Sequence, residues 1–363
     1  MKLGVEAALV DGALVPGDVD VVEGRIARVG ISSPNGRGVA VPGFIDLQVN
    51  GFGGVDFLEA DAEGYRRAGE ALLETGVTGY LPTLITTPED ELVAAMKEIP
   101  IVAEGPRILG IHLEGPFLSQ RRLGTHPASA RRDPDLGLLE RLLAAGPVRM
   151  MTLAPELPGS DGLIEELHAR GVTVSCGHSD ATSEQANAAF DNGIRTVTHL
   201  FNAMRPFEHR DPGIAGAALA RDDVIVQIIN DGVHLAPDTV RLVWHAAAGR
   251  VALVTDAMAG AGVPDGPYSL GSLEVVVRDG AVRGPNGVLA GSVLTMIDAV
   301  RNLHALGISF EDAVGAASAV PARILGRSDL GVLEPGGPAD VVVLDDRLEI
   351  VRVLCGGSAR VVA

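Results

Sequence analysis

The central part of the chain alternates between fully apolar runs and amphipathic stretches. Eight apolar runs of strand length each end at a glycine, a proline or a polar residue, and they span 41–50, 76–86, 107–114, 148–155, 172–178, 195–199, 224–234 and 250–256. Helical periodicity lies between many of them, for example over 61–74, 89–97, 133–145, 183–192 and 237–248. Strands that are apolar on both faces and separated by amphipathic helices are typical of a covered parallel sheet. Eight such units predict an α/β fold, a (β/α)8 TIM-like barrel.

The two ends of the chain have a different pattern, in which apolar and polar residues alternate. Residues 1–41 contain such a stretch on each side of Glu23-Gly24, a dipeptide typical of a hairpin turn. Residues 331–363 alternate in the same way. Because a period of two indicates strands with one covered face, we expect both termini to build one small β-sandwich domain. Residues 42–330 would then form the barrel.

A second change of pattern interrupts the barrel near 268–289, after the eighth apolar run. Apolar and polar residues alternate there around Asp279-Gly280, which favours a tight hairpin turn. The segment predicts a β-hairpin insertion at the carboxyl end of the eighth strand.

Four of the apolar runs close on residues that bind metals or move protons. These are Glu114, His178, His199 and Asp256. In a closed barrel the carboxyl ends of the strands meet at one rim, where active sites lie. Two imidazoles and a carboxylate hold a zinc-like cation and leave a position open for water, and a further carboxylate serves as general base. A doubly wound open sheet, the competing architecture, gives no reason to gather ligands from strands so far apart.

Further polar residues lie on loops beyond the strand ends. His126, on the loop after Glu114, is a candidate for polarising a carbonyl and binding the oxyanion that forms on attack. His234 is the last residue of the seventh run and is a candidate substrate contact, and Arg210 lies on a polar loop where it could capture an anion such as phosphate. We expect Asp46, in the first run, to support the site rather than to bind the metal.

Composition and charge restrict the partners of the protein. The formal net charge of −18 argues against nucleic acid, because phosphate backbones need a basic face. We expect a cytoplasmic protein, since the two cysteines, Cys176 and Cys355, lie far apart and provide no disulfide framework. No membrane contact is expected, because the chain has no run of about 18 uncharged apolar residues and its start lacks the apolar stretch of a signal peptide. Neither a nucleotide-binding phosphate loop nor a serine-esterase motif occurs.

The motifs together resemble the N-acetylglucosamine-6-phosphate deacetylase family of the amidohydrolase superfamily. They occur in the order and with the spacing of that family, at 42–51, 112–117, 177–179, 198–204, 231–234, 254–257 and 333–340. The resemblance implies hydrolysis of N-acetyl-D-glucosamine 6-phosphate to D-glucosamine 6-phosphate and acetate, in amino-sugar catabolism or cell-wall recycling. It covers the chain from the N-terminal β-strands to the closing segment.

The resemblance also implies roles for individual residues. It assigns the metal to Glu114, His178 and His199, makes Asp256 the catalytic acid and base, and makes His126 the group that polarises the acetamide carbonyl. It implies substrate contacts at Thr125, His126, Asn202, Ala203, Arg210, His234, Leu289, Ala290 and Gly291. In the family the counterpart of Arg210 reaches the site of the neighbouring subunit, which implies a homodimer.

One departure from the wider superfamily concerns the first strand. Many amidohydrolases have His-x-His there for a second metal, whereas this chain has Gln48-Val49-Asn50. Because neutral amides are poor ligands for transition metals, we expect one divalent cation, most simply Zn2+, with Fe2+, Co2+ or Mn2+ as alternatives.

The sequence leaves three other functions open. The C4 epimer, N-acetylgalactosamine 6-phosphate, would undergo the same chemistry. A cyclic amidase of the dihydroorotase or hydantoinase type would need His-x-His and usually a bridging modified lysine, and no lysine lies at a strand end. A non-catalytic sugar-phosphate sensor on the same barrel would be expected to lack Glu114 or Asp256, and both are present.

Overall fold

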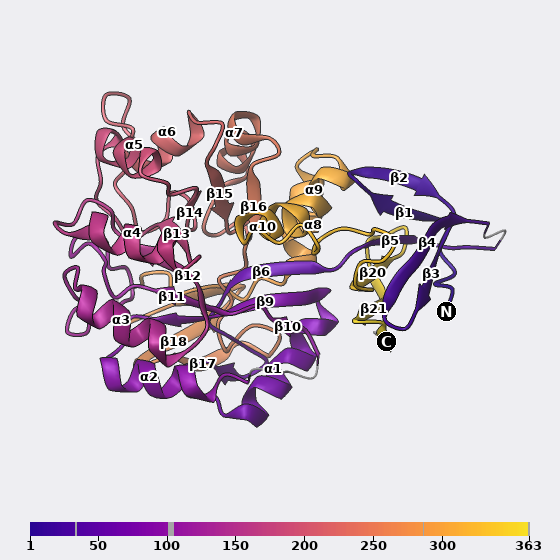
Figure 1. The fold of residues 1–363 in the computed structure, drawn as a ribbon, viewed down its shortest axis with the longest axis horizontal. Coiled ribbons are helices and arrows are strands. Elements are labelled where there is room, and N and C mark those ends of the chain that lie inside the picture. The colour runs from indigo at the N-terminus through magenta and orange to yellow at the C-terminus, as the bar shows by residue number, and fades with distance from the viewer. Residues whose placement is uncertain (33–34, 101–104, 286, 362–363) are drawn as a thin grey trace.

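The structure, a computed structural model, describes residues 1–363 except 33–34, 101–104, 286 and 362–363. It consists of a large barrel and a smaller β-structure at one end of the molecule, where both chain termini lie (Figure 1). None of the helices in the described residues is both long and apolar enough to cross a membrane.

The barrel is built from the predicted apolar runs. Its strands are β6 (Phe44–Val49), β9 (Val77–Ile85), β11 (Ile111–Glu114), β12 (Val148–Leu153), β13 (Thr173–Cys176), β14 (Thr196–Val197), β15 (Ile225–Ile228) and β16 (Val251–Leu253). Neighbours in this order pair in parallel. A parallel bridge between Val49 and Ala257 brings the last strand back to the first. The predicted (β/α)8 barrel is therefore confirmed.

The third apolar run forms two pieces rather than one strand. A short strand, β10 (Arg107–Ile108), pairs with the first part of β9, and β11 pairs with its last part. Gly110 lies between them with a φ of 134°, a conformation that favours glycine. The apolar pattern alone does not reveal this break, because the residues on both sides of it are apolar.

Helices cover the outside of the barrel (Figure 1). They are α1 (Ala62–Glu74), α2 (Glu89–Glu98), α3 (Leu136–Ala145), α4 (Ser160–Ala169), α5 (Ser183–Asp191), α6 (Gly213–Leu219), α7 (Pro237–Ala247), α8 (Met296–Ala305), α9 (Phe310–Ala317) and α10 (Ala319–Ile324). Local sequence explains their starts: Asp61 accepts a hydrogen bond from the third residue of α1, and Thr182 and Gln185 form a capping box on α5. In α1 the residues Tyr65, Ala68 and Leu72 recur at helical spacing and are buried.

The smaller β-structure joins strands from both ends of the chain. Its sheet has the order β2 (Ala13–Pro16), β1 (Ala7–Val10), β5 (Val39–Pro42), β20 (Val341–Leu344), β21 (Ile350–Cys355) and β22 (Ser358–Val361). A hairpin of β3 (Asp18–Val22) and β4 (Arg25–Ile31) packs on it through a separate apolar core that includes Val19, Ile26 and Val341. This arrangement supports the division into 1–41 with 331–363 and 42–330, which stays a prediction.

The segment after the eighth barrel strand forms a three-stranded antiparallel sheet. It consists of β17 (Gly266–Leu270), β18 (Leu273–Arg278) and β19 (Ala281–Arg283). Asp279 and Gly280, with φ values of 51° and 75°, make the tight turn between β18 and β19. The short strands β7 (Gly51–Phe52) and β8 (Val55–Asp56) form a ribbon after β6, and Asp56 accepts a hydrogen bond from the Gly271 N–H at 2.6 Å. The insertion is thereby attached to the rim of the barrel.

Candidate active site

The four predicted rim residues lie at or just beyond the carboxyl ends of their strands. Glu114 is the last residue of β11, His178 and His199 follow β13 and β14, and Asp256 follows β16. Three of these residues have left-handed backbone: φ is 47° at His178, 28° at His199 and 51° at Asp256. Non-glycine residues adopt this region at an energetic cost, and such residues concentrate at functional sites. The chain therefore turns sharply at these three strand ends, and the side chains point toward the rim cavity.

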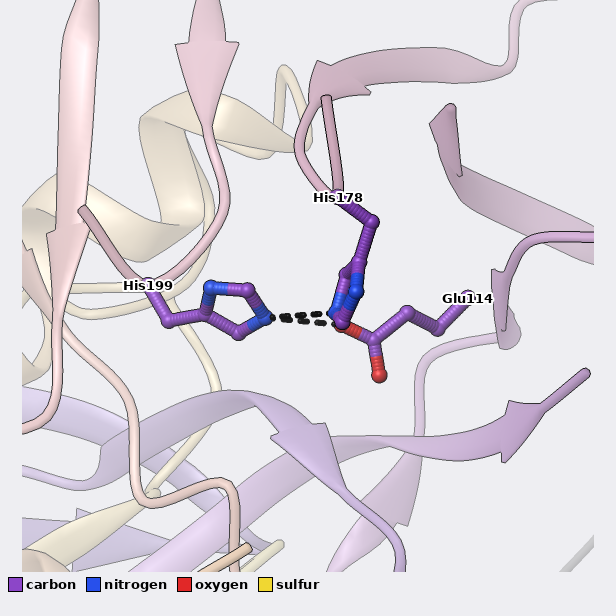
Figure 2. A group of neighbouring side chains, drawn as sticks. All are labelled: Glu114, His178 and His199. Carbon is purple, nitrogen blue, oxygen red and sulfur yellow. Dashed lines mark hydrogen bonds and ion pairs between the residues drawn. The ribbon is translucent and has the colours of Figure 1, made fainter. Parts of the chain in front are cut away.

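Glu114, His178 and His199 bring three ligand atoms to one point (Figure 2). Glu114 Oε1 lies 3.1 Å from His178 Nε2 and 3.0 Å from His199 Nε2, and the two Nε2 atoms are 3.1 Å apart. Ligand atoms around a tetrahedral zinc ion are roughly 3.3 Å from one another, given bonds of about 2.0–2.1 Å. The three donors are therefore spaced to share one cation. Among the residues that the structure describes, no other group of His, Cys and acidic side chains has its ligand atoms so close together.

The orientation of His178 is fixed from outside the cluster. Its Nδ1 lies 2.9 Å from the main-chain carbonyl oxygen of Arg122, so Nδ1 donates a hydrogen bond there and the neutral ring can offer the Nε2 lone pair to a cation at the cluster. His199 has no such hydrogen bond, because its buried Nδ1 has no partner among the described atoms. All three side chains are almost completely buried.

Mutual electrostatics shift the pKa values of all three residues of the cluster. Burial raises the pKa of Glu114, but the charges and hydrogen bonds of His178, His126 and His199 outweigh it and hold that pKa well below its usual value. Burial and the nearby His126 lower the pKa of His178. Burial also lowers the pKa of His199, but its hydrogen bond to Glu114 reverses the shift and the pKa ends up raised. Glu114 is therefore ionised at neutral pH.

Asp256 lies beside the cluster as a separate carboxylate. Asn50 Nδ2 donates to its Oδ1 at 2.7 Å, and Oδ2 accepts no hydrogen bond from the residues that the structure describes. Burial, followed by the charge of Glu114, raises the pKa of Asp256 to about 6. A cation at the cluster would oppose the effect of Glu114 and lower this pKa. Asp256 is thus suited to accept a proton near neutral pH.

The amides that replace His-x-His serve as donors to the two carboxylates. Gln48 Nε2 donates to Glu114 Oε1 at 3.0 Å, as Asn50 does to Asp256. Asp46 lies deeper, where its Oδ2 accepts from the Thr255 hydroxyl at 2.6 Å and burial raises its pKa to about 7. Asp46 therefore connects β6 to the segment that carries Asp256, and its hydrogen bonds go to backbone and hydroxyl groups, as expected of a supporting residue.

His126 closes the site from the loop after β11. The Thr86 N–H donates to its Nδ1 at 3.3 Å, and the Thr86 hydroxyl lies 2.9 Å from the same nitrogen. With Nδ1 as acceptor, the ring proton lies on Nε2, which is 3.6 Å from Glu114 Oε2. A buried N–H aimed at the cluster is a suitable donor to a developing oxyanion.

These side chains line a cavity of about 320 Å³ at the rim of the barrel. The predicted contacts on its wall are Thr125, His126, Asn202, Ala203, His234, Leu289 and Gly291, together with Glu114, His178, His199 and Asp256. Ala290 is fully buried and is not among the residues that line the cavity. Arg210 is exposed and is not part of the wall, and no lysine or arginine lines the cavity among the described residues.

Part of the wall has no counterpart among the predicted contacts. Ile85, Ile229, Leu270 and Val288 add apolar surface, and the last two come from the inserted segment. Asp231 lies outside the wall but fixes His234, since its Oδ2 is 2.7 Å from His234 Nδ1. Cys176 is fully buried in the barrel core, as expected of a core residue.

Comparisons with known proteins identify the family of the chain and its fold. Residues 39–360 match the model of the amidohydrolase family. The chain is 41% identical over 342 residues to N-acetylglucosamine-6-phosphate deacetylase of Homo sapiens, covering 89% of this chain and 83% of that protein. It is 37% identical over 325 residues to N-acetylgalactosamine-6-phosphate deacetylase of Escherichia coli O157:H7, covering 87% and 86%. A mutant N-acetyl-D-glucosamine-6-phosphate deacetylase from Mycobacterium smegmatis, solved with N-acetyl-D-glucosamine-6-phosphate, superposes with a TM-score of 0.91 at 36% identity over 98% of this chain and 97% of that one.

Proposed function

This chain belongs to the amidohydrolase family, and we propose that the protein hydrolyses the acetamide of N-acetyl-D-glucosamine 6-phosphate in this cavity. The products are D-glucosamine 6-phosphate and acetate. The observation that carries the proposal is the convergence of Glu114, His178 and His199 on one point, with Asp256 beside them in the same cavity. Relatives named for this reaction match most of the chain, which supports the choice of substrate.

The superfamily implies a divalent metal, and the cluster fits one. Glu114, His178 and His199 would hold it, since their donor atoms are spaced for a shared cation. When bound, such a cation lowers the pKa of water and polarises a carbonyl oxygen. We propose a single zinc ion, because two imidazole nitrogens and one carboxylate oxygen are a catalytic zinc set. The amide side chains of Gln48 and Asn50 occupy the place of a second site as hydrogen-bond donors.

Two side chains have separate roles, since Asp256 moves the proton and His126 stabilises the developing charge. Asp256 accepts a proton from the attacking water, with Asn50 holding its Oδ1 and leaving Oδ2 available. His126 donates a hydrogen bond from Nε2 to the oxygen that gains charge when the carbonyl carbon becomes tetrahedral. Asp256 then passes its proton to the sugar nitrogen, so that the C–N bond breaks with an amine rather than an amide anion as the leaving group.

The phosphate of the substrate needs a positive partner that the cavity itself does not supply. Among the described residues its wall carries no arginine or lysine, and Arg210 is exposed on the loop after β14. We therefore propose a homodimer in which Arg210 completes the site of the other subunit. An apolar groove of about 630 Å³ next to His234 supports this, since Phe207 and Leu242 on its wall are 54% and 60% exposed. A second copy would cover this surface.

Replacing Arg210 tests the shared site. Arg210→Ala is expected to raise the KM for the phosphate ester about 10- to 100-fold, the equivalent of about 1.5–3 kcal/mol for lost charged hydrogen bonds. Mixed dimers of Arg210→Ala and Asp256→Asn chains should recover a low KM, because one site then has both Asp256 and a partner's Arg210. Steady-state kinetics of the separated and mixed chains measure this. Arg241→Ala, which removes an exposed arginine from α7, is the control, and failure of the mixture to recover would place Arg210 outside the partner's site.

Two alternative functions, a non-catalytic sensor and a deacetylase for the galactosamine epimer, have less support. The three residues of the cluster and Asp256 are all present, which disfavours a non-catalytic sensor. The galactosamine epimer is not favoured, because a relative named for it is less similar than the human glucosamine relative. A cytoplasmic location in amino-sugar catabolism or cell-wall recycling is proposed, supported by two cysteines that are free in the structure.

The function is tested by acetate release from chelator-stripped protein restored with zinc. N-acetylglucosamine 6-phosphate, N-acetylgalactosamine 6-phosphate and unphosphorylated N-acetylglucosamine are compared side by side. We expect zinc-dependent release from the first substrate, with the highest kcat/KM of the three. No release from it with any divalent metal would refute the deacetylase proposal, and a preference for the second would reverse the choice of epimer.

A further inference from the structure

Three loops at the rim of the barrel meet at the side chain of Asp180. Its Oδ1 accepts a hydrogen bond from Arg122 Nε at 2.7 Å, and its Oδ2 lies 3.1 Å from Arg121 and 3.5 Å from Arg205. Both Arg121 and Arg122 belong to the loop after β11, whereas Arg205 belongs to the loop after β14. Asp180 itself is on the loop after β13, just beyond His178. The Asp180 side chain is only 10% exposed and that of Arg122 29%, whereas that of Arg121 is 79% exposed, so the Arg122–Asp180 pair is better shielded from water than the Arg121–Asp180 pair.

Arg122 contacts both Asp180 and His178. Its guanidinium holds Asp180, and its main-chain carbonyl accepts the hydrogen bond from His178 Nδ1. The same loop contacts His178 a second time, since the Ser119 N–H donates to the His178 carbonyl at 2.9 Å. The position of one peptide carbonyl therefore sets the orientation of the His178 ring. The Arg122–Asp180 pair in turn fixes that peptide relative to the strand end that carries His178.

Asp180 is itself held in place. Glu156 Oε1 accepts from the Asp180 N–H at 2.7 Å, and Glu156 Oε2 accepts from the Ser179 hydroxyl at 2.6 Å. On the other side, Arg205 donates through its main-chain N–H to the Ser179 carbonyl at 3.0 Å and through Nε to Asp211 at 2.7 Å. The loop after β13 is thus tied to both of its neighbours. A carboxylate with so many fixed contacts provides a rigid reference point for Arg122.

We propose that Asp180 is a positioning residue for the metal centre, which it organises by holding Arg122 so that the Arg122 carbonyl orients His178. The proposal rests on the metal-dependent function proposed above. Groups that orient a metal-binding histidine typically set metal affinity by about 10- to 100-fold. An ordinary exposed ion pair would contribute little to either stability or metal binding. A measurement of zinc affinity therefore distinguishes a pair that orients His178 from an ordinary exposed ion pair.

The test is zinc affinity, measured by competition with a chromophoric chelator on the full-length chain. Asp180→Asn keeps the shape of the side chain and removes its charge, and it is expected to weaken zinc binding about 10- to 100-fold. Arg122→Ala should cause a similar loss, and the double variant no further loss, because both act through one contact. Arg122→Lys keeps one ion pair and should recover part of the affinity. The visible spectrum of the cobalt(II) form is expected to change in the same variants.

Asp223→Asn is the matched control. Asp223 also pairs with two arginines, Arg221 at 2.9 Å and Arg195 at 3.7 Å, but it lies before β15 at the opposite end of the barrel. Its loss should leave zinc affinity unchanged. Unaltered zinc affinity in Asp180→Asn, or losses that add in the double variant, would overturn the proposal. Should Asp180→Asn fail to fold, the comparison of Arg122→Ala with Arg122→Lys decides the same question. Tight zinc binding without acetate release would refute the deacetylase function and leave this inference standing.

Discussion

Asp256→Asn is expected to lower kcat by about 10²- to 10⁴-fold, the range that positioned acid–base groups contribute. The amide of Asn can still accept the hydrogen bond that Asn50 donates at 2.7 Å, so the geometry of the cavity is retained. It cannot take a proton from water or deliver one to the amine. Substrate binding and zinc content should therefore change little. Acetate release, calorimetric binding of N-acetylglucosamine 6-phosphate and metal analysis measure the three quantities separately.

The control for this substitution is Asp238→Asn, which changes an aspartate whose side chain is 96% exposed on α7. It should leave kcat unchanged. A loss of less than tenfold in Asp256→Asn would mean that another group moves the proton, and His126 and His234 are the candidates on the cavity wall outside the metal cluster. A loss of zinc from Asp256→Asn would instead make Asp256 a ligand.

The barrel could be predicted from sequence because its strands are buried on both faces. β9, for example, is buried at every position and appears in the sequence as a long apolar run between turn residues. The rim residues could be predicted for a related reason. A histidine or an acid that ends such a run is polar where the pattern is apolar, so Glu114 and His199 are conspicuous. The closed order of parallel strands then brings these residues together.

Other features of the site carry no such signal. Ile85 and Ile229 line the cavity, but apolar residues at strand ends look the same whether they face a ligand or the core. Asp180 is one of many acids on polar loops, and its importance comes from three arginines whose positions depend on how separate loops fold. The proposed role of Arg210 could not be derived from the sequence pattern either. The residues that it would contact belong to another copy of the chain.

Glu114→Gln is expected to weaken zinc binding by more than about 100-fold, because it removes the ionised ligand itself rather than a group that orients one. Glu114 Oε1 is the atom that both Nε2 atoms approach, at 3.1 and 3.0 Å, and a neutral amide is a poor substitute there. Deacetylase activity at limiting zinc should fall with the bound metal. The increase in melting temperature that zinc gives the wild-type chain by binding the folded state should also disappear.

Metal analysis and thermal melts with and without zinc check this prediction, with Glu166→Gln on α4 as the control for loss of a glutamate charge in an exposed ion pair. Glu114→Gln and chelator-stripped wild type should both fold, because Glu114 is one residue in a barrel whose core is apolar. If the variant retained one zinc ion per chain with unchanged affinity, the metal would have to lie away from the point where Glu114, His178 and His199 converge. The assignment of the cluster, and with it the role of Asp256 as its neighbouring base, would then be wrong.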